Sequence, residues 1–198
     1  MDTYRLFLAV DLRRDTDARL DALTAAAHRE VGREFRPVSK GRRHLTLRFL
    51  GDTDSNLVES MASDIGKILG EEDPFYITVE GAGAFPNPER ARVLWAGIEE
   101  GSGRVADLAA SINEILSEDY GFDPESKPFH PHVTVGRFRG RPMDVRELID
   151  FYAGEMWGRD PVEEVQLIRS QLGRGGPTYT VLEKIPLGGD WPTEKKLV

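Results

Sequence analysis

A pattern that occurs twice, 88 residues apart, constrains the fold of this 198-residue chain more than any other feature of its sequence. Hydrophobic periodicity predicts strand, helix, strand, helix and strand at residues 4–12, 15–31, 44–51, 54–70 and 75–83. The second half repeats this order, with strands at 92–98, 132–138 and 162–170 and helices marked by apolar residues from Val105 to Leu116 and from Val145 to Tyr152. One offset serves all these elements, which predicts two structurally equivalent lobes.

The expected organisation is a single bilobal domain over residues 1–198, with lobes at roughly 1–85 and 89–170. A last strand at 177–187 lies outside the repeat and is expected to pair with the sheet of one lobe. Pro86, Asn87 and Pro88 form a short loop between the lobes. Because no flexible linker separates them, the lobes should share an interface.

The same short motif stands in one predicted strand of each half. It reads histidine, apolar residue, threonine, apolar residue, and it occurs at residues 44–47 and 132–135. Residues two apart in a strand point to the same face, so each histidine and its threonine look one way and the apolar residues look the other. If the lobes pack about a pseudo-twofold axis, His44 and Thr46 face His132 and Thr134 across one cleft.

Two imidazoles in one cleft suit the displacement of a phosphodiester. A neutral histidine can remove a proton from attacking water while a protonated histidine donates one to the departing ribose oxygen. The ordinary histidine pKa of about 6.5 lets both forms coexist near neutrality without a large shift. The threonine hydroxyls can donate to phosphate oxygens, and a nearby arginine can offset the growing negative charge.

The other histidines point to no metal site. His28 is expected to be a surface or cap residue of the first helix, and His130 to lie at the cleft margin or to be satisfied by backbone. His130 and His132 are spaced like metal ligands, but the chain has no cysteine and no equivalent third ligand precedes His44. We therefore expect neither a metal ion nor another cofactor.

The formal charge of −8 argues against a general nucleic-acid coat protein, because such proteins neutralise many phosphates. A ligand with one or a few phosphates is still compatible with it. Arginine and lysine gather at residues 29–48 and again at 137–141, beside the two motifs. Most of these side chains are expected to be solvated surface or to steer RNA.

The motifs resemble those of the 2H phosphoesterase superfamily, which is named for two His-x-Thr-x motifs. Within it, the chain resembles the bacterial and archaeal RNA 2',3'-cyclic phosphodiesterases, once called 2'-5' RNA ligases. The resemblance spans nearly the whole chain and includes RLFLAVDL at 5–12, HLTLRFLG at 44–51, GAFPNPERARVLWAGI at 83–98, PFHPHVTVGRF at 128–138 and LGRGGPTYTVLEKIPL at 172–187.

This resemblance implies a bilobal α+β fold in which two antiparallel β-sheets line a central cleft and helices lie outside. It also implies hydrolysis of an RNA terminal 2',3'-cyclic phosphate to a 2'-phosphate. His44 matches the general acid, His132 the general base that activates water, and Thr46 and Thr134 the phosphate-binding hydroxyls. Pseudosymmetry makes the two histidines indistinguishable from the residues alone.

Arg137 stands where members of the family often carry a phosphate-contacting arginine, so we expect it to bind phosphate. It follows Thr134 by three residues, and this odd spacing would turn it to the opposite face of an ideal strand. A β-bulge or twist near Gly136 is therefore required for Arg137 to reach the cleft.

Three other activities are compatible with these residues. The same groups could join a cyclic phosphate to a 5'-hydroxyl, which is 2'-5' ligation by the reverse reaction. They could act on ADP-ribose 1'',2''-cyclic phosphate or a small cyclic nucleotide, or form a non-catalytic RNA-end or nucleotide-binding module that has no need of histidine at 44 and 132.

The expected partners are RNA 3' ends with a 2',3'-cyclic phosphate or small cyclic nucleotides. We expect a monomer with no obligate protein partner. The apolar run from Leu6 to Val10 is too short for a signal peptide or a membrane span, so a cytoplasmic location without membrane contact is expected.

Overall fold

The structure is a computed structural model that describes residues 2–125, 127–173 and 176–191. Its strands are β1 (Thr3–Asp11), β2 (Phe35–Pro37), β3 (His44–Asp54), β4 (Phe75–Phe85), β5 (Val93–Ile98), β6 (His132–Phe138), β7 (Met156–Val162), β8 (Glu164–Gly173) and β9 (Gly176–Pro186). Its helices are α1 (Arg14–Arg19), α2 (Asp21–Val31), α3 (Val58–Leu69), α4 (Ser102–Tyr120) and α5 (Arg146–Phe151), with short 3-10 turns at Gly32–Glu34, Ser55–Leu57 and Pro88–Arg90.

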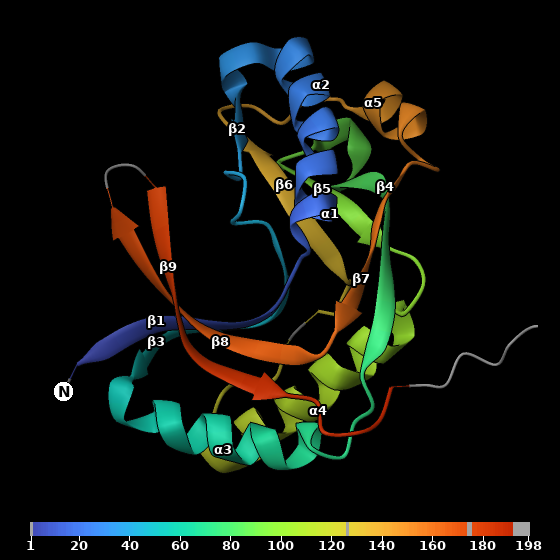
Figure 1. Cartoon of the computed structure of the whole chain (residues 1–198). Helices are drawn as coiled ribbons and strands as arrows, with labels where there is room; N and C mark the ends of the chain where they lie inside the picture. Colours follow the sequence, from blue (N-terminus) through green and yellow to red (C-terminus); the bar gives the residue numbers. More distant parts are fainter. Residues whose placement is uncertain (1, 126, 174–175, 192–198) are drawn as a thin grey trace, which may run out of the picture.

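The strands form two antiparallel half-sheets that meet at one point (Figure 1). The first half-sheet has the order β3-β1-β8-β9 and the second has the order β6-β5-β4-β7. A single pair of residues, Leu45 and Val133, joins β3 to β6. The short strand β2 pairs with the later residues of β6, on the edge opposite β5. The expected antiparallel α+β fold is confirmed, and the two expected sheets are the halves of one continuous nine-stranded sheet.

The boundary between the two half-sheets does not follow the contiguous lobes expected at roughly 1–85 and 89–170. The third strand of each half of the chain lies in the other half-sheet: β4 pairs with β5, and β8 pairs with β1. The short connection between β4 and β5 favours this arrangement, because consecutive strands joined by few residues pair most readily. Hydrophobic periodicity predicts that a segment is a strand, but it does not identify the neighbour of that strand.

The two half-sheets are related by the 88-residue offset, even though strands are exchanged. The offset takes β3 to β6 and β1 to β5, and each pair occupies the same place in its half-sheet. It also takes β4 to β8, but these two strands have exchanged half-sheets. The same offset relates Leu45 to Val133, the pair at the junction. The pseudo-twofold axis therefore passes between the two motif strands, and this brings both motifs to the centre of the molecule.

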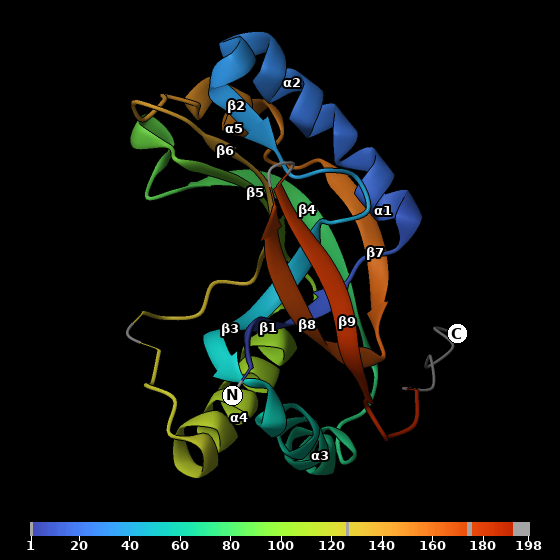
Figure 2. The same ribbon diagram turned by 90° about the vertical axis from the view of Figure 1, so that its left-hand side faces the viewer.

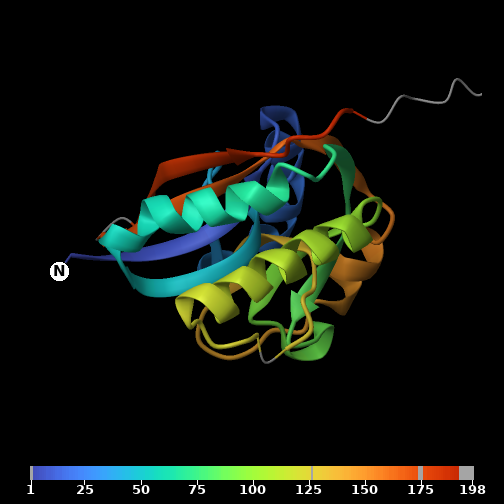
Figure 3. The same cartoon turned by 90° about the horizontal axis from the view of Figure 1, so that it is seen from below.

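Helices cover the outer face of each half-sheet. α3 and α4 lie side by side below the first half-sheet, as the view from below shows (Figure 3). α1, α2 and α5 contact strands β7, β6 and β4 of the second half-sheet, at the other end of the molecule (Figure 2). Among the described residues, no helix is long and apolar enough to cross a membrane.

Three elements differ from the expected ones. The helix expected at 15–31 is divided by a turn at Leu20 into α1 and α2. Strands β2 and β7 were not expected. β7 contains Gly158 and Pro161, which are uncommon in central strands, but β7 is an edge strand, where proline is tolerated.

Candidate active site

The two motifs begin two strands that are neighbours in space. His44 is the first residue of β3, and His132 is the first residue of β6. Leu45 and Val133 are fully buried, whereas the histidine and threonine of each motif are only partly buried. The motif side chains therefore share the face opposite the core, as the two-residue periodicity of a strand predicts.

A cavity of about 830 Å³ opens over the junction of the two half-sheets. Leu45 pairs with Val133 in an antiparallel register. The residues on either side of this pair therefore face each other, His44 opposite Thr134 and Thr46 opposite His132. His44, Thr46 and Thr134 line this cavity. His132 lies beside it and is not one of the described residues that form its wall.

Both motif histidines are held in the same way. Nδ1 of His44 lies 2.9 Å from the backbone oxygen of Arg42, and Nδ1 of His132 lies 2.7 Å from the backbone oxygen of His130. A carbonyl oxygen can only accept a hydrogen bond, so Nδ1 carries the proton in each ring. Nε2 is then the atom that accepts or donates a proton toward the ligand.

Aromatic side chains surround the two imidazoles. Phe7 stacks on His44 with ring centroids 4.9 Å apart, and Tyr179 meets the same imidazole edge-on at 5.5 Å. Phe85 meets His132 edge-on at 4.9 Å. These aromatic neighbours were not expected from the sequence.

The 88-residue offset could have identified one aromatic residue near the motif histidine in each half of the chain. It relates Phe7 to Trp95, whose ring centroid lies 6.1 Å from that of His132. Both aromatic residues lie in the strand next to a motif strand, β1 beside β3 and β5 beside β6. A search for aromatic residues at equivalent positions would therefore have found them.

Burial lowers the pKa of both motif histidines below the ordinary value of 6.5. The neighbouring charge of His132 lowers the pKa of His44 further, and the charges of His130 and Arg137 do the same to His132. The backbone hydrogen bonds at Nδ1 oppose this shift. Burial is the largest cause of the shift in both histidines, because it disfavours the charged form of the imidazole.

These shifts predict the pH dependence of an acid-base reaction. The acid must be protonated and the base neutral, and both pKa values are lowered in the free protein. We expect kcat/KM for a small cyclic phosphate to peak on the acid side of pH 6.5 and to fall as pH rises and the acid loses its proton. A steady-state pH profile measures this, and a maximum above about pH 7.5 would contradict it, since ordinary histidines titrate near 6.5.

Arg137 reaches the cavity because its strand contains an irregularity. The pairing of β5 with β6 shifts register between Leu94 and Trp95, so that Gly136 and Thr134 face consecutive residues of β5. The buried residue Val135 is the extra one, and Arg137 beyond it is exposed and lines the cavity. The β-bulge expected near Gly136 is confirmed.

The equivalent position in the other half-sheet carries an aromatic residue. β3 has the same break in register against β1, and the 88-residue offset relates Arg137 to Phe49. The Phe49 side chain is 64% exposed and lines the cavity. At this pair of equivalent positions the cavity therefore has an arginine on one side and a phenylalanine on the other.

The arginines of the basic segment at 29–48 include buried side chains in ion pairs and side chains that line the cavity without a carboxylate partner in the described part of the chain. Arg43 and Arg48 are buried and form ion pairs, so they are neither surface nor free to steer RNA. Arg36 and Arg42 line the cavity. None of the described residues in the cavity wall is an aspartate or a glutamate, although the chain has a net charge of −8.

The remaining histidines lie outside the cavity wall. His28 is exposed near the end of α2, as expected for a surface or cap residue. The ring of His130 packs edge-on against Trp95 at 4.8 Å, while its backbone oxygen holds His132. Within the described ranges, no three His, Cys, Asp or Glu side chains are grouped so that they could hold a metal ion.

Comparisons with known proteins agree with this geometry. The family model described as the 2'-5' RNA ligase superfamily matches residues 14–174. The RNA 2',3'-cyclic phosphodiesterase of Thermus thermophilus is 36% identical, over 96% of this chain and 94% of that protein. The enzyme of the same name from Aquifex aeolicus is 36% identical, over 74% of this chain and 78% of the relative.

Solved structures show the same fold. TT0787 of Thermus thermophilus superimposes with a TM-score of 0.72 at 35% identity, over 93% of this chain and 98% of that one. Escherichia coli LigT in complex with 3'-AMP superimposes with a TM-score of 0.75 at 26% identity, over 95% of this chain and all (100%) of that one.

Proposed function

Since this chain belongs to the 2'-5' RNA ligase superfamily, we propose that it hydrolyses the terminal 2',3'-cyclic phosphate of RNA to a 2'-phosphate. The observation that carries the proposal is the junction of the two motif strands at Leu45 and Val133, beside one cavity. Relatives that align with most of the chain are named RNA 2',3'-cyclic phosphodiesterases. The solved structure of a relative in complex with 3'-AMP supports a nucleotide as the ligand.

In the proposed reaction, each of the two histidines transfers one proton. Nε2 of His132 takes a proton from water as the water oxygen attacks phosphorus. The bond between phosphorus and the ribose 3'-oxygen breaks, and Nε2 of His44 donates its proton to that oxygen. The 2'-oxygen keeps the phosphate, and a proton exchange with solvent restores both histidines. The assignment of His44 as acid and His132 as base follows the family resemblance.

The phosphate oxygens are held by side chains that stay in place during the reaction. The hydroxyls of Thr46 and Thr134 face the cavity from the two motif strands, and Arg137 lies at the end of β6. Preorganised donors of this kind stabilise the negative charge on the phosphate oxygens in the transition state. With proton transfer and charge compensation both supplied by side chains, we propose that no metal ion takes part.

The proposed function is tested with a labelled oligonucleotide that ends in a 2',3'-cyclic phosphate, incubated with the protein in excess EDTA. We expect a single product, the 2'-phosphate, at the same rate with and without the chelator. Comparison with synthetic 2'- and 3'-phosphate standards identifies the isomer. Activity that EDTA abolishes and a divalent ion restores would contradict the metal-independent mechanism.

A further inference from the structure

The cavity contains more positive charge than one cyclic phosphate needs. Six arginines line it among the residues that the structure describes. Arg43 is paired with Asp17 and Asp21, and Arg42 donates a hydrogen bond to the backbone oxygen of Pro177 at 2.7 Å. The other four have no carboxylate partner among the described residues, and they are Arg5, Arg36, Arg137 and Arg139. A cyclic phosphate is a monoanion, so it compensates only one of these charges.

Two of these four arginines are direct neighbours. Arg36 of β2 and Arg137 of β6 are paired across the antiparallel ladder, and both are exposed and line the cavity. Paired residues in an antiparallel ladder point to the same side, and like charges placed directly opposite each other are destabilising. An anion bound beside both guanidinium groups would remove this cost.

The position of Arg36 is fixed by the packing of its neighbours. Phe35 is buried against Phe138 with ring centroids 5.2 Å apart, which anchors β2 on β6. Gly136 leaves the room for this contact, because a Cβ atom there would lie 2.2 Å from the ring of Phe35. β2, a strand of three residues beside β6 (Figure 2), is thus held in place, and its middle residue Arg36 lines the cavity.

We propose that Arg36 binds the phosphodiester that joins the terminal nucleotide to the rest of the RNA, next to the cyclic phosphate held by Arg137. This inference rests on the proposed function and adds a substrate preference to it: an RNA end is recognised through two successive phosphates. β2 lies one strand further from β5 than β6 does, so Arg36 is displaced from Arg137 across the sheet. A planar guanidinium suits a phosphodiester that must be bound but not cleaved.

The test compares two substrates that differ by one adenylyl nucleotide, which brings with it the phosphodiester that Arg36 is proposed to bind. One is adenosine 2',3'-cyclic phosphate, and the other is the adenylyl dinucleotide that ends in a 2',3'-cyclic phosphate. We expect the wild-type protein to show a higher kcat/KM on the dinucleotide. Arg36→Ala should lower the dinucleotide-to-mononucleotide ratio of kcat/KM about tenfold, the effect of losing one hydrogen bond to a charged group.

Arg33→Ala is the matched control. Arg33 precedes Arg36 by three residues, is exposed and is absent from the described cavity wall, so its removal changes the net charge equally. We expect the substrate ratio of Arg33→Ala to equal that of the wild-type protein. An equal effect of both variants would overturn the site, because general electrostatic attraction would then explain the preference.

Three other outcomes are distinguishable. If Arg36→Ala lowers kcat/KM equally for both substrates, Arg36 serves the reacting phosphate and the inference is wrong. If the wild-type protein turns over both substrates with equal kcat/KM, the second phosphate is not recognised and the inference is also wrong. Turnover of neither substrate by the wild-type protein would remove the proposed function, and the inference would fall with it.

Discussion

Replacing His44 or His132 with asparagine is expected to lower kcat by a factor on the order of 10² to 10⁴, the usual contribution of a positioned acid or base. Asparagine has a similar reach to the Nδ1 side of the ring but cannot exchange a proton near neutral pH. Both histidines are anchored at Nδ1 by a backbone oxygen, so each has only Nε2 available for chemistry. Multiple-turnover kinetics on a 2',3'-cyclic phosphate end measures the loss.

The double variant should be little worse than the poorer single variant, because both groups act in one transition state. His28→Asn is the matched control, since His28 is exposed on α2, away from the cavity, and we expect no change in kcat. Binding of a 2'-phosphate product should persist in both single variants, because Thr46, Thr134 and Arg137 remain. Two well-folded single variants with near wild-type turnover would rule out the acid-base pair.

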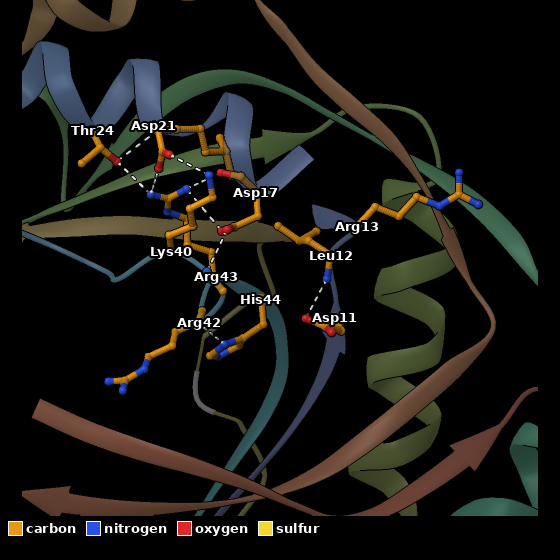
Figure 4. Close-up of polar contacts among 12 residues, drawn as sticks. Asp11, Leu12, Arg13, Asp17, Asp21, Thr24, Lys40, Arg42, Arg43 and His44 are labelled. Carbon is orange, nitrogen blue, oxygen red and sulfur yellow. Dashed lines mark hydrogen bonds and ion pairs between the residues drawn. The ribbon is translucent and has the colours of Figure 1, made fainter. Parts of the chain in front are cut away.

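Arg43→Ala is expected to lower the free energy of unfolding by about 3–5 kcal/mol, the usual cost of removing one partner of a buried ion pair. Nη1 of Arg43 lies 3.2 Å from Oδ1 of Asp17, and these side chains are only 2% and 6% exposed. Nη2 of Arg43 lies 2.6 Å from Oδ1 of Asp21 (Figure 4). Without the guanidinium, the Asp17 carboxylate is left buried and unpaired.

This ion pair also ties the first two helices to the segment that precedes His44. The other carboxylate oxygen of Asp17 accepts a hydrogen bond from the backbone N–H of Gly41 at 2.8 Å. Arg43 itself directly precedes the motif histidine. Loss of the pair should therefore loosen the segment whose backbone oxygen at Arg42 holds the imidazole.

Lys40→Ala is the control for this stability prediction. Nζ of Lys40 lies 3.5 Å from the same Asp21, but the lysine side chain is 62% exposed. An exposed pair contributes at most about 1 kcal/mol, so its loss should be small. Urea unfolding of the two variants measures the difference. If both variants lower the free energy of unfolding by the same small amount, the buried pair of Arg43 and Asp17 stabilises the protein no more than the exposed pair of Lys40 and Asp21.

Much of the fold could be predicted from the sequence because the repeat is visible in the hydrophobic pattern. The motif strands β3 and β6, and helices α3 and α4, lie where the periodicity predicts them. The exchange of β4 and β8 between the half-sheets could not be predicted, because strand pairing depends on contacts distant in sequence. Strand β7 was missed because Gly158 and Pro161 interrupt its pattern.

The site could be predicted only in part. Residues two apart in a strand share a face, so the placement of each histidine with its threonine followed from spacing alone. The contacts of Phe85 and Tyr179 with the histidines and the lowered pKa of each histidine depend on tertiary packing, which spacing does not describe. Burial also distinguishes Arg43, which is held in a buried ion pair, from Arg36, which is exposed, although both belong to one basic segment.

A sulfur atom in place of the 3'-oxygen of the cyclic phosphate separates the two proton transfers. A thiolate is a far weaker base than an alkoxide, so it can leave phosphorus without a proton from a general acid. We predict that His44→Asn regains most of its lost kcat on the 3'-thio substrate, whereas His132→Asn remains as slow as on the oxygen substrate. If each variant lowers kcat by the same factor on the 3'-thio substrate as on the oxygen substrate, His44 is not the general acid and His132 is not the general base, and the mechanism is wrong.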